Sequence, residues 1–231
     1  MLASLGYTVP GMRKLLLSVL AALAAHAQGP APDVFASMQE ISAALGVTCD
    51  YCHTAARGSG APEPKKDIAR AMIAMTRELN AKIEAATGKS GPAATRVQCV
   101  TCHRCVAIPR QLGDILWQAL REQGAEPAIA EYRDLRQRYY GRQAYDFGED
   151  TLLVLAQRIV ESRPGDAIAL LHLNLEFNPR SARSYMLLAH AYTRKFDDNS
   201  AMANLEKALE IEPENGVARG QLEQLKSYHR K

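Results

Sequence analysis

Two five-residue segments combine a pair of thiols with a neighbouring imidazole. The segment Cys-Asp-Tyr-Cys-His at 49–53 recurs as Cys-Val-Thr-Cys-His at 99–103. In such a C-x-x-C-H segment the two thiols form thioethers with the vinyl groups of a porphyrin, and the adjacent imidazole binds the iron. We therefore predict two covalently bound haem c groups, each with a histidine as proximal ligand. The attachment residues are Cys49, Cys52, Cys99 and Cys102, and the iron ligands are His53 and His103.

Two other chemistries also use closely spaced cysteines. Repeated C-x-x-C pairs bind zinc, but a zinc site gives no reason for a histidine directly after both pairs. A disulfide within each pair would close a very short loop and would constrain the unfolded chain only slightly. Haem accounts for the histidines, while zinc and disulfide remain open as alternatives.

Each motif is preceded by a segment with helical periodicity. Upstream of the first motif, Asp33 is predicted to cap a helix that Gly46 ends. Upstream of the second, beyond a loop over 57–66, Asp67 is predicted to cap a helix that Gly88 ends. We expect both helices to bury one apolar face. The first face comprises Val34, Met38, Ile41 and Leu45, and the second comprises Ile68, Met72, Met75, Leu79 and Ile83.

The sixth ligand of a low-spin cytochrome iron is often a methionine thioether, which raises the reduction potential. The two helices carry Met38, Met72 and Met75. A methionine can also simply fill an irregular core, but a methionine-bearing helix before each motif favours iron ligation. Met38 is the candidate for the first haem, and Met72 and Met75 both remain candidates for the second.

Residues 33–110 resemble the cytochrome subunit of bacterial photosynthetic reaction centres. The resemblance lies in the segment 69–80, which contains Met-Ile-Ala-Met, and in Val-Gln-Cys-Val-Thr-Cys-His-Arg at 97–104. In that family the first methionine of such a pair is the axial ligand, which implies Met72 here and leaves Met75 for packing. The sequence departs from the family in having two motifs instead of four, Cys105 in place of a glycine, and no lipid-attachment cysteine. The resemblance implies an electron carrier and does not imply photosynthesis.

The C-terminal part has a longer repeat. Pro179 and Pro213 lie thirty-four residues apart, which is the length of a tetratricopeptide unit. The residues between them that fit this repeat are Tyr185, Leu188, Ala189, Tyr192, Ala201, Leu205 and Ala208. The preceding unit resembles the repeat more loosely, with Asn174 where alanine is usual. Residues 111–145 are predicted to form two further helices, and residues 216–227 a capping helix.

These patterns predict an all-α chain, with loops around the haems, in several parts. Residues 1–27 have the form of a signal peptide: Arg13 and Lys14, an apolar run over 15–25, and Ala-His-Ala at 25–27. A di-haem cytochrome c domain is predicted over 28–110, a helical connector over 111–147, and tetratricopeptide-like repeats with a capping helix over 148–231. Haem attachment through thioethers takes place outside the cytoplasm. We therefore expect an exported protein that is periplasmic, extracellular, or associated with a membrane through a partner.

Composition and charge narrow the function. The formal net charge is +3, and no basic stripe with interleaved aromatics is present, so nucleic acid is not an expected partner. The leading hypothesis is an electron carrier without enzymatic activity, acting between redox partner proteins. The sequence indicates no small-molecule substrate. Self-association of the protein is compatible with the sequence. The alternatives are a di-haem peroxidase-like enzyme, which needs an open iron site and acid–base groups, and a repeat scaffold with structural haems.

Some residues keep more than one interpretation. Cys105 is predicted to be a buried, inert thiol, with an intermolecular disulfide as the alternative. His172, His190 and His229 are the remaining histidines outside the motifs and the leader, and a bis-histidine haem could recruit one of them. The repeats could dock a partner protein or only stabilise the haem domain.

Overall fold

The structure, a computed structural model, describes residues 34–54 and 61–228. Within these ranges the secondary structure is entirely helical, which confirms the predicted all-α fold class. The predicted signal segment, Asp33 and His229 lie outside the described residues. The chain divides into two compact units, residues 1–42 and residues 43–231. No helix in the described ranges is both long and apolar enough to cross a membrane.

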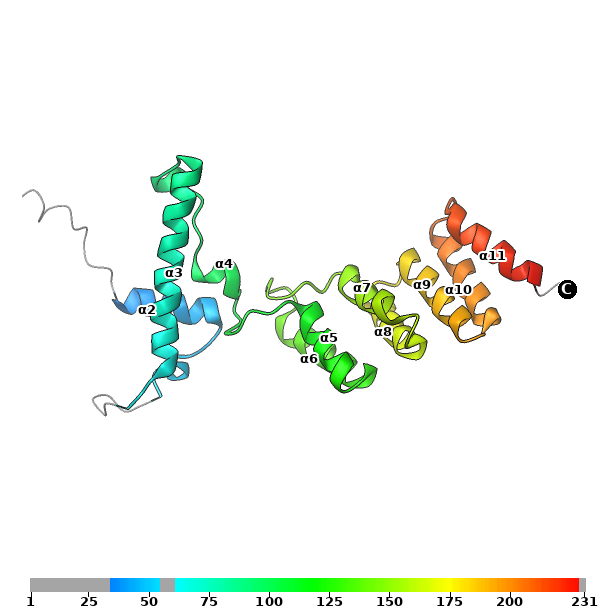
Figure 1. Cartoon of the computed structure of the whole chain (residues 1–231), viewed down its shortest axis with the longest axis horizontal. Coiled ribbons are helices and arrows are strands. Elements are labelled where there is room, and N and C mark those ends of the chain that lie inside the picture. The colour runs from blue at the N-terminus through cyan, green and yellow to red at the C-terminus, as the bar shows by residue number, and fades with distance from the viewer. Residues whose placement is uncertain (1–33, 55–60, 229–231) are drawn as a thin grey trace, which may run out of the picture. The chain divides into compact units, whose positions relative to one another are not determined.

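In the described residues of the region that carries the two motifs, the structure has three α-helices (Figure 1). They are α2 (Val34–Leu45), α3 (Pro64–Thr87) and α4 (Cys99–His103), with 3₁₀ turns at Cys49–Tyr51 and Gly91–Ala93. Gly46 and Gly88 follow α2 and α3 with φ of +67° and +64°, as predicted, because glycine accepts the left-handed conformation without a Cβ clash.

The predicted start of α3 is wrong. The helix begins at Pro64, with Glu63 as its N-cap, and Asp67 lies inside the first turn instead of capping it. Proline suits the first helical position because its fixed φ is helical and the missing N–H would have had no partner in the helix. Asp67 stabilises the turn in another way, through its charge near the helix N-terminus and an ion pair with Arg70 at 2.5 Å.

Four of the five residues in the predicted buried face of α3 are exposed, and Ile83 is half-buried. The apolar side chains Ile68, Met72, Met75 and Leu79 all lie on the surface. A neighbouring stripe of the same helix is half-buried instead, and comprises Lys66, Ala69, Ile73, Thr76, Asn80, Ile83 and Glu84. Among the described side chains between 35 and 110, Ala44 is the one that is buried. The buried hydrophobic clusters of the described residues all lie after residue 110.

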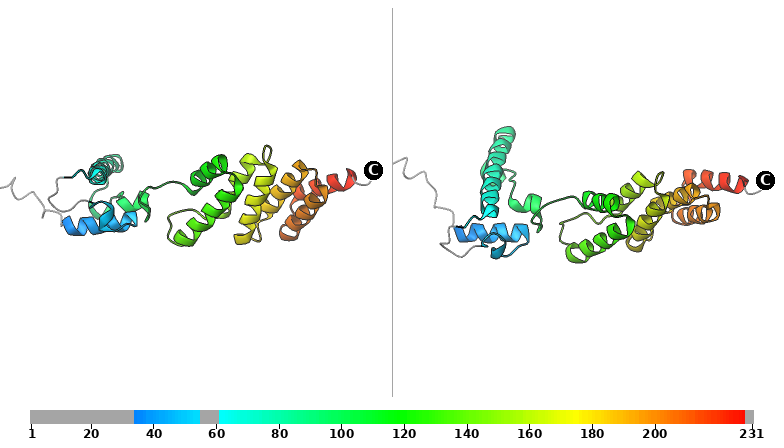
Figure 2. Two further views of the ribbon diagram at one scale, coloured as in Figure 1. Left: turned by 90° about the horizontal axis from the view of Figure 1, so that it is seen from below. Right: turned by 60° about the horizontal axis from the view of Figure 1, so that its bottom comes forward.

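The remaining helices form antiparallel pairs that follow one another along the chain (Figures 1 and 2). They are α5 (Leu112–Glu122), α6 (Ala125–Tyr139), α7 (Glu149–Ile159), α8 (Pro164–Phe177), α9 (Ala182–Arg194), α10 (Asp198–Ile211) and α11 (Gly216–Tyr228). Contacts join α5 to α6 and each of α7 to α10 to the next helix. The two predicted connector helices and the final helix are present, and α8 and α10 end just before Pro179 and Pro213.

Small residues bring these helices close together. Ala156, Ala167, Ala189, Ala201 and Ala208 are buried at the helix contacts, as a tetratricopeptide packing requires. The aliphatic core around them is formed mainly by leucines: Leu152, Leu155, Leu170, Leu171, Leu173, Leu188 and Leu205.

Asn174 occupies a position where the tetratricopeptide repeat usually has alanine, and the structure explains this difference. Its amide donates to the Ser184 hydroxyl at 2.9 Å, and its carbonyl oxygen accepts from the Asn178 amide at 2.9 Å. Ser184 also receives a hydrogen bond from the Ser181 hydroxyl at 2.9 Å. A buried polar network therefore replaces the alanine contact, and its members satisfy one another.

Candidate haem-binding site

The second motif is a single turn of α-helix with its own cap. The backbone N–H of Gln98 donates to the Thr101 hydroxyl at 3.0 Å, and the Thr101 backbone N–H donates to the Gln98 carbonyl at 3.0 Å. The turn ends at Arg104 and Cys105, which have φ of +48° and +67°. Cys99 and Cys102 are thus three residues apart on one turn, the arrangement that haem attachment through two vinyl groups requires.

His103 is held in a form that suits an iron ligand. Its Nδ1 lies 3.0 Å from the carbonyl oxygen of Val106. Because a carbonyl only accepts, this hydrogen bond uses Nδ1 as the donor and leaves Nε2 for a metal. Ligating histidines commonly have their second ring nitrogen fixed in this way, which sets both tautomer and ring orientation.

The first motif is a tighter turn. Residues Cys49–Tyr51 form a 3₁₀ turn, and the backbone N–H of His53 donates to the Cys49 carbonyl at 3.0 Å. Cys52 is half-buried, while Cys49 and His53 are exposed. Both motifs therefore place two thiols and an imidazole on one turn, although the local helix type differs.

Helix α3 is attached to both motifs. Near its N-terminus, the Lys65 ammonium lies 3.7 Å from the centre of the Tyr51 ring, inside the first motif. Farther along, Asn80 donates to the Val97 carbonyl at 2.9 Å and accepts from the Val97 N–H at 2.7 Å. Val97 lies two residues before Cys99.

An ion pair between Arg96 and Glu84, at 2.9 Å, reinforces this second attachment. The segment that precedes the second motif is therefore held at successive residues against the last half of α3. Asn80 and Val97 belong to the segments that resemble the reaction-centre cytochrome family. In the structure the two residues are joined by two hydrogen bonds, which explains why both are present.

The flanks of the two motifs also meet. The N–H of Cys105 donates to the Ala44 carbonyl at 2.9 Å. A Cβ added to Gly46 would lie 2.3 Å from the Cys105 carbonyl oxygen, so only glycine fits. The chain just before the first motif thus packs on the chain just after the second. Cys105 was predicted to be buried; it is half-buried, because this left-handed turn lies at the surface.

The candidate methionine ligands are more accessible than predicted. The exposed fractions are 44% for Met38, 38% for Met72 and 52% for Met75. Met72 and Met75 belong to the apolar stripe of α3, whose side chains are only partly covered by protein atoms. A flat apolar group with a metal that accepts thioether and imidazole ligands fits this stripe and this donor set. Met38 lies in the first unit, whereas both motifs lie in the second.

The described residues contain neither a disulfide nor a cluster of metal-binding side chains. All five cysteines, Cys105 included, are free thiols. Within the described ranges, no three His, Cys, Asp or Glu side chains converge as a metal site. His190 lies 2.6 Å from a Glu161 carboxylate oxygen, and His172 lies 3.5 Å from the Tyr192 hydroxyl. Both histidines therefore have partners within the repeat region: the partner of His190 lies in the turn after α7, and that of His172 lies on α9. The hydrogen bond with His190, aided by the nearby Arg194, lowers the pKa of Glu161.

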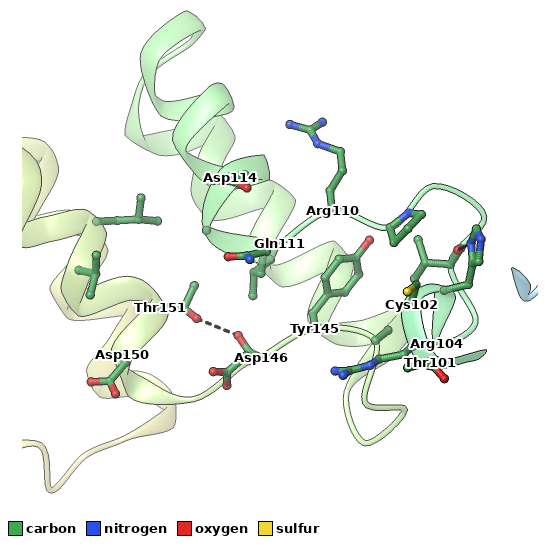
Figure 3. Close-up of a pocket in the computed structure, with 18 of the residues that line it drawn as sticks. Thr101, Cys102, Arg104, Arg110, Gln111, Asp114, Tyr145, Asp146, Asp150 and Thr151 are labelled. Carbon is green, nitrogen blue, oxygen red and sulfur yellow. Dashed lines mark hydrogen bonds between the residues drawn. The ribbon is translucent and has the colours of Figure 1, made fainter. Parts of the chain in front are cut away.

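A cavity of about 650 Å³ borders the second motif (Figure 3). Cys102 and Arg104 lie on one side of it, Tyr145 projects between the walls, and Asp150 and Thr151 belong to the helix α7 side. His103 also lines the cavity. The volume falls in the range of small-molecule and cofactor sites.

Comparison with known proteins agrees with this geometry. Residues 60–140 match the family "photosynthetic reaction centre cytochrome C subunit". Both resemblances inferred from the sequence are confirmed, since residues 182–215 match the tetratricopeptide repeat. Cytochrome c-554 of Chloroflexus aurantiacus is 38% identical over 65 residues, a match that covers 28% of this chain and 15% of that protein. The similarity supports an electron-carrier role with covalently bound haem c.

The boundaries of the family match add two facts. The match includes the second motif and begins after the first, so it supports one haem site directly. It also extends through α5 and α6, beyond residue 110 where the sequence placed the end of the haem domain.

Proposed function

We propose that the protein is an exported di-haem c-type cytochrome that passes electrons between redox partner proteins. Cys49 and Cys52 attach the first haem, and Cys99 and Cys102 attach the second. The iron ligands are His53 with Met38, and His103 with Met72. The observation that carries the proposal is the pair of thiol–imidazole turns attached to one helix whose apolar, methionine-bearing stripe is exposed.

Each group of residues has a distinct part in this function. The thioether sulfurs fix each porphyrin to its turn, and the haem iron supplies the one-electron exchange. The carbonyl of Val106 holds His103 in the ligating tautomer. The thioether of Met72 favours the reduced iron and raises its potential, while Ile68 and Leu79 on the same stripe exclude water.

Burial of this stripe against a porphyrin would also supply the missing core. Full burial of a side chain of this size contributes about 1.5–3 kcal/mol. The haems would therefore stabilise a region in which Ala44 is the one buried residue among the described side chains between 35 and 110. We infer that this region folds stably only after haem attachment, which is consistent with the predicted export and periplasmic maturation.

We propose that the repeat helices dock a redox partner protein. The tetratricopeptide match and the close packing of α7 to α10 support this role. Stabilisation of the haem region by the same helices is the competing explanation.

A paired substitution tests the ligand assignment. Met72→Ala is expected to abolish the methionine–iron charge-transfer band of one oxidised haem and to lower that haem's potential. Met75→Ala, on the same stripe and one turn away, is the matched control and is expected to keep both the charge-transfer band and the reduction potential. Met38→Ala is expected to remove the band of the other haem. The proposal fails if neither Met38→Ala nor Met72→Ala changes the oxidised spectrum, or if the intact mass shows fewer than two attached haems.

A further inference from the structure

The turn that follows the second motif is strained. Arg104 and Cys105, neither of them glycine, have φ of +48° and +67°. This left-handed backbone is unfavourable for a residue with a Cβ, and it persists only where the surroundings hold it. The N–H of Arg104 still bonds within α4, to the Val100 carbonyl at 3.2 Å, but Cys105 lies beyond the helix and needs another support.

This turn brings a carbonyl back onto the proximal histidine. The Val106 N–H donates to the His103 carbonyl at 2.8 Å, and the Val106 carbonyl oxygen lies 3.0 Å from His103 Nδ1. Because the two left-handed residues lie between His103 and Val106, the position of this acceptor depends on the backbone of the turn. A carbonyl that accepts from a ligating imidazole makes the ring a stronger donor to the metal, and a stronger donor favours the oxidised iron.

The support for Cys105 comes from the chain that leads into the first motif. The Cys105 N–H donates to the Ala44 carbonyl at 2.9 Å, and the Ala44 side chain is buried. A Cβ on Gly46 would lie 2.3 Å from the Cys105 carbonyl oxygen and 2.9 Å from its carbonyl carbon, so the two backbones are in direct contact. The peptide groups on both sides of the Cys105 Cα are therefore held by residues 44–46, one through a hydrogen bond and the other through packing.

We propose that residues 44–46, which lead into the first motif, are positioning residues of the second haem site. They hold the turn after the second motif, the turn places the Val106 carbonyl against His103, and this hydrogen bond lowers the potential of the second haem. The inference rests on the proposed attachment of haem to Cys99 and Cys102. It goes beyond the proposed function because it makes the chain around one haem a determinant of the potential of the other.

Two substitutions in this segment test the proposal in the full-length holoprotein, each with a matched control. Gly46→Ala forces the Cys105 carbonyl to move, and Ala44→Gly removes a buried methyl group and loosens the end of α2 without a clash. Gly91→Ala also places alanine at a positive φ, of +63°, but no atom of the described residues outside the adjoining chain lies within 4 Å of the added Cβ. Ala43→Gly makes the same change one residue earlier in α2, at an exposed position.

The second haem couple is expected to respond. Redox titration with optical detection follows both couples, and a Cys49→Ser/Cys52→Ser variant, which keeps the second haem alone, assigns them. Gly46→Ala weakens the hydrogen bond to His103 and so raises the ratio of reduced to oxidised second haem at a fixed potential at least threefold, which is about 28 mV for one electron. Ala44→Gly raises the same ratio at least about twofold, and both controls leave the two couples in place.

A local effect of these changes would fall on the other haem. Gly46 lies three residues before Cys49, so damage confined to its own neighbourhood shifts or removes the first haem. The inference is overturned if the first couple shifts as much as the second, or if both couples stay within about twofold of wild type in both variants. It is also overturned if Gly91→Ala or Ala43→Gly shifts the second couple equally.

Loss of haem is informative as well. A Gly46→Ala protein that loses the second haem and keeps the first supports the inference, and one that loses only the first contradicts it. If Gly46→Ala gives no holoprotein, the comparison of Ala44→Gly with Ala43→Gly decides. Absence of haem at the second motif in the wild-type protein would instead refute the proposed function itself.

Discussion

Replacement of Asn80 is expected to release the segment that precedes the second motif. In the structure this side chain makes two hydrogen bonds to one residue, donating to the Val97 carbonyl at 2.9 Å and accepting from the Val97 N–H at 2.7 Å. Each such bond contributes about 1 kcal/mol net. Asn80→Ala therefore weakens this attachment by about 2 kcal/mol, without touching a haem ligand.

Native-state hydrogen exchange of the Val97 amide measures this loss directly. A change of about 2 kcal/mol corresponds to exchange that is about thirtyfold faster, since each 1.4 kcal/mol is a factor of ten. Asn80→Asp keeps an acceptor for the Val97 N–H but loses the donor to the Val97 carbonyl, so it is expected to fall between wild type and Asn80→Ala.

A control on the same helix separates this effect from general loosening. The Thr87 hydroxyl donates to the Ile83 carbonyl at 2.8 Å within α3 and has no role at the motif. Thr87→Ala is expected to leave Val97 exchange unchanged. The reasoning is wrong if Asn80→Ala changes Val97 exchange less than about threefold, a difference of about 0.7 kcal/mol, or if Thr87→Ala accelerates it equally.

Three further predictions concern other parts of the chain. Gly46→Ala is expected to lower the melting temperature of the holoprotein far more than Gly91→Ala; both sites have positive φ, at a cost of about 1–2 kcal/mol, but only the first meets a backbone oxygen. Asn174→Ala is expected to cost about 1–3 kcal/mol in denaturant unfolding, and Asn174→Ala/Ser184→Ala less than the sum of the two single changes, because each single change already breaks the shared hydrogen bond between Asn174 and Ser184. Asp197 caps α10, and hydrogen bonds from the backbone N–H and the hydroxyl of Ser200 lower the pKa of Asp197. The contribution of the ionised Asp197 cap to folding stability is therefore complete at neutral pH and is lost as the pH falls below about 4, through the lowered pKa. An Asp197→Asn variant is expected to lack this pH dependence of the melting temperature.

Much of the fold could be predicted from periodicity and helix stops. Gly46 and Gly88 end helices where predicted, and the thirty-four-residue spacing of Pro179 and Pro213 gave the correct hairpin order. These signals are local, because a glycine stop or a proline after a helix depends on the backbone at that position. The start of α3 was missed because Pro64 suits the first helical position, so the helix begins three residues before Asp67.

The environment of the candidate site was harder to predict. A helical stripe of apolar residues usually indicates a face packed on protein, yet Met72 and Leu79 are exposed. The hydrogen bonds between Asn80 and Val97 could not be predicted from the sequence. The two residues are seventeen apart, and the bonds depend on the course of the intervening loop. The ligand roles of Met38 and Met72 stay predictions.

Helix α3 has a consequence for how this region can vary among homologues. Lys65 and Asn80 are fifteen residues apart and attach to different motifs, so the helix between them acts as a spacer of about 22 Å. Insertion of one residue there would rotate one attachment by about 100° relative to the other. Insertions and deletions are therefore expected to be excluded from this stretch, and homologues should differ in length in the loops that flank it.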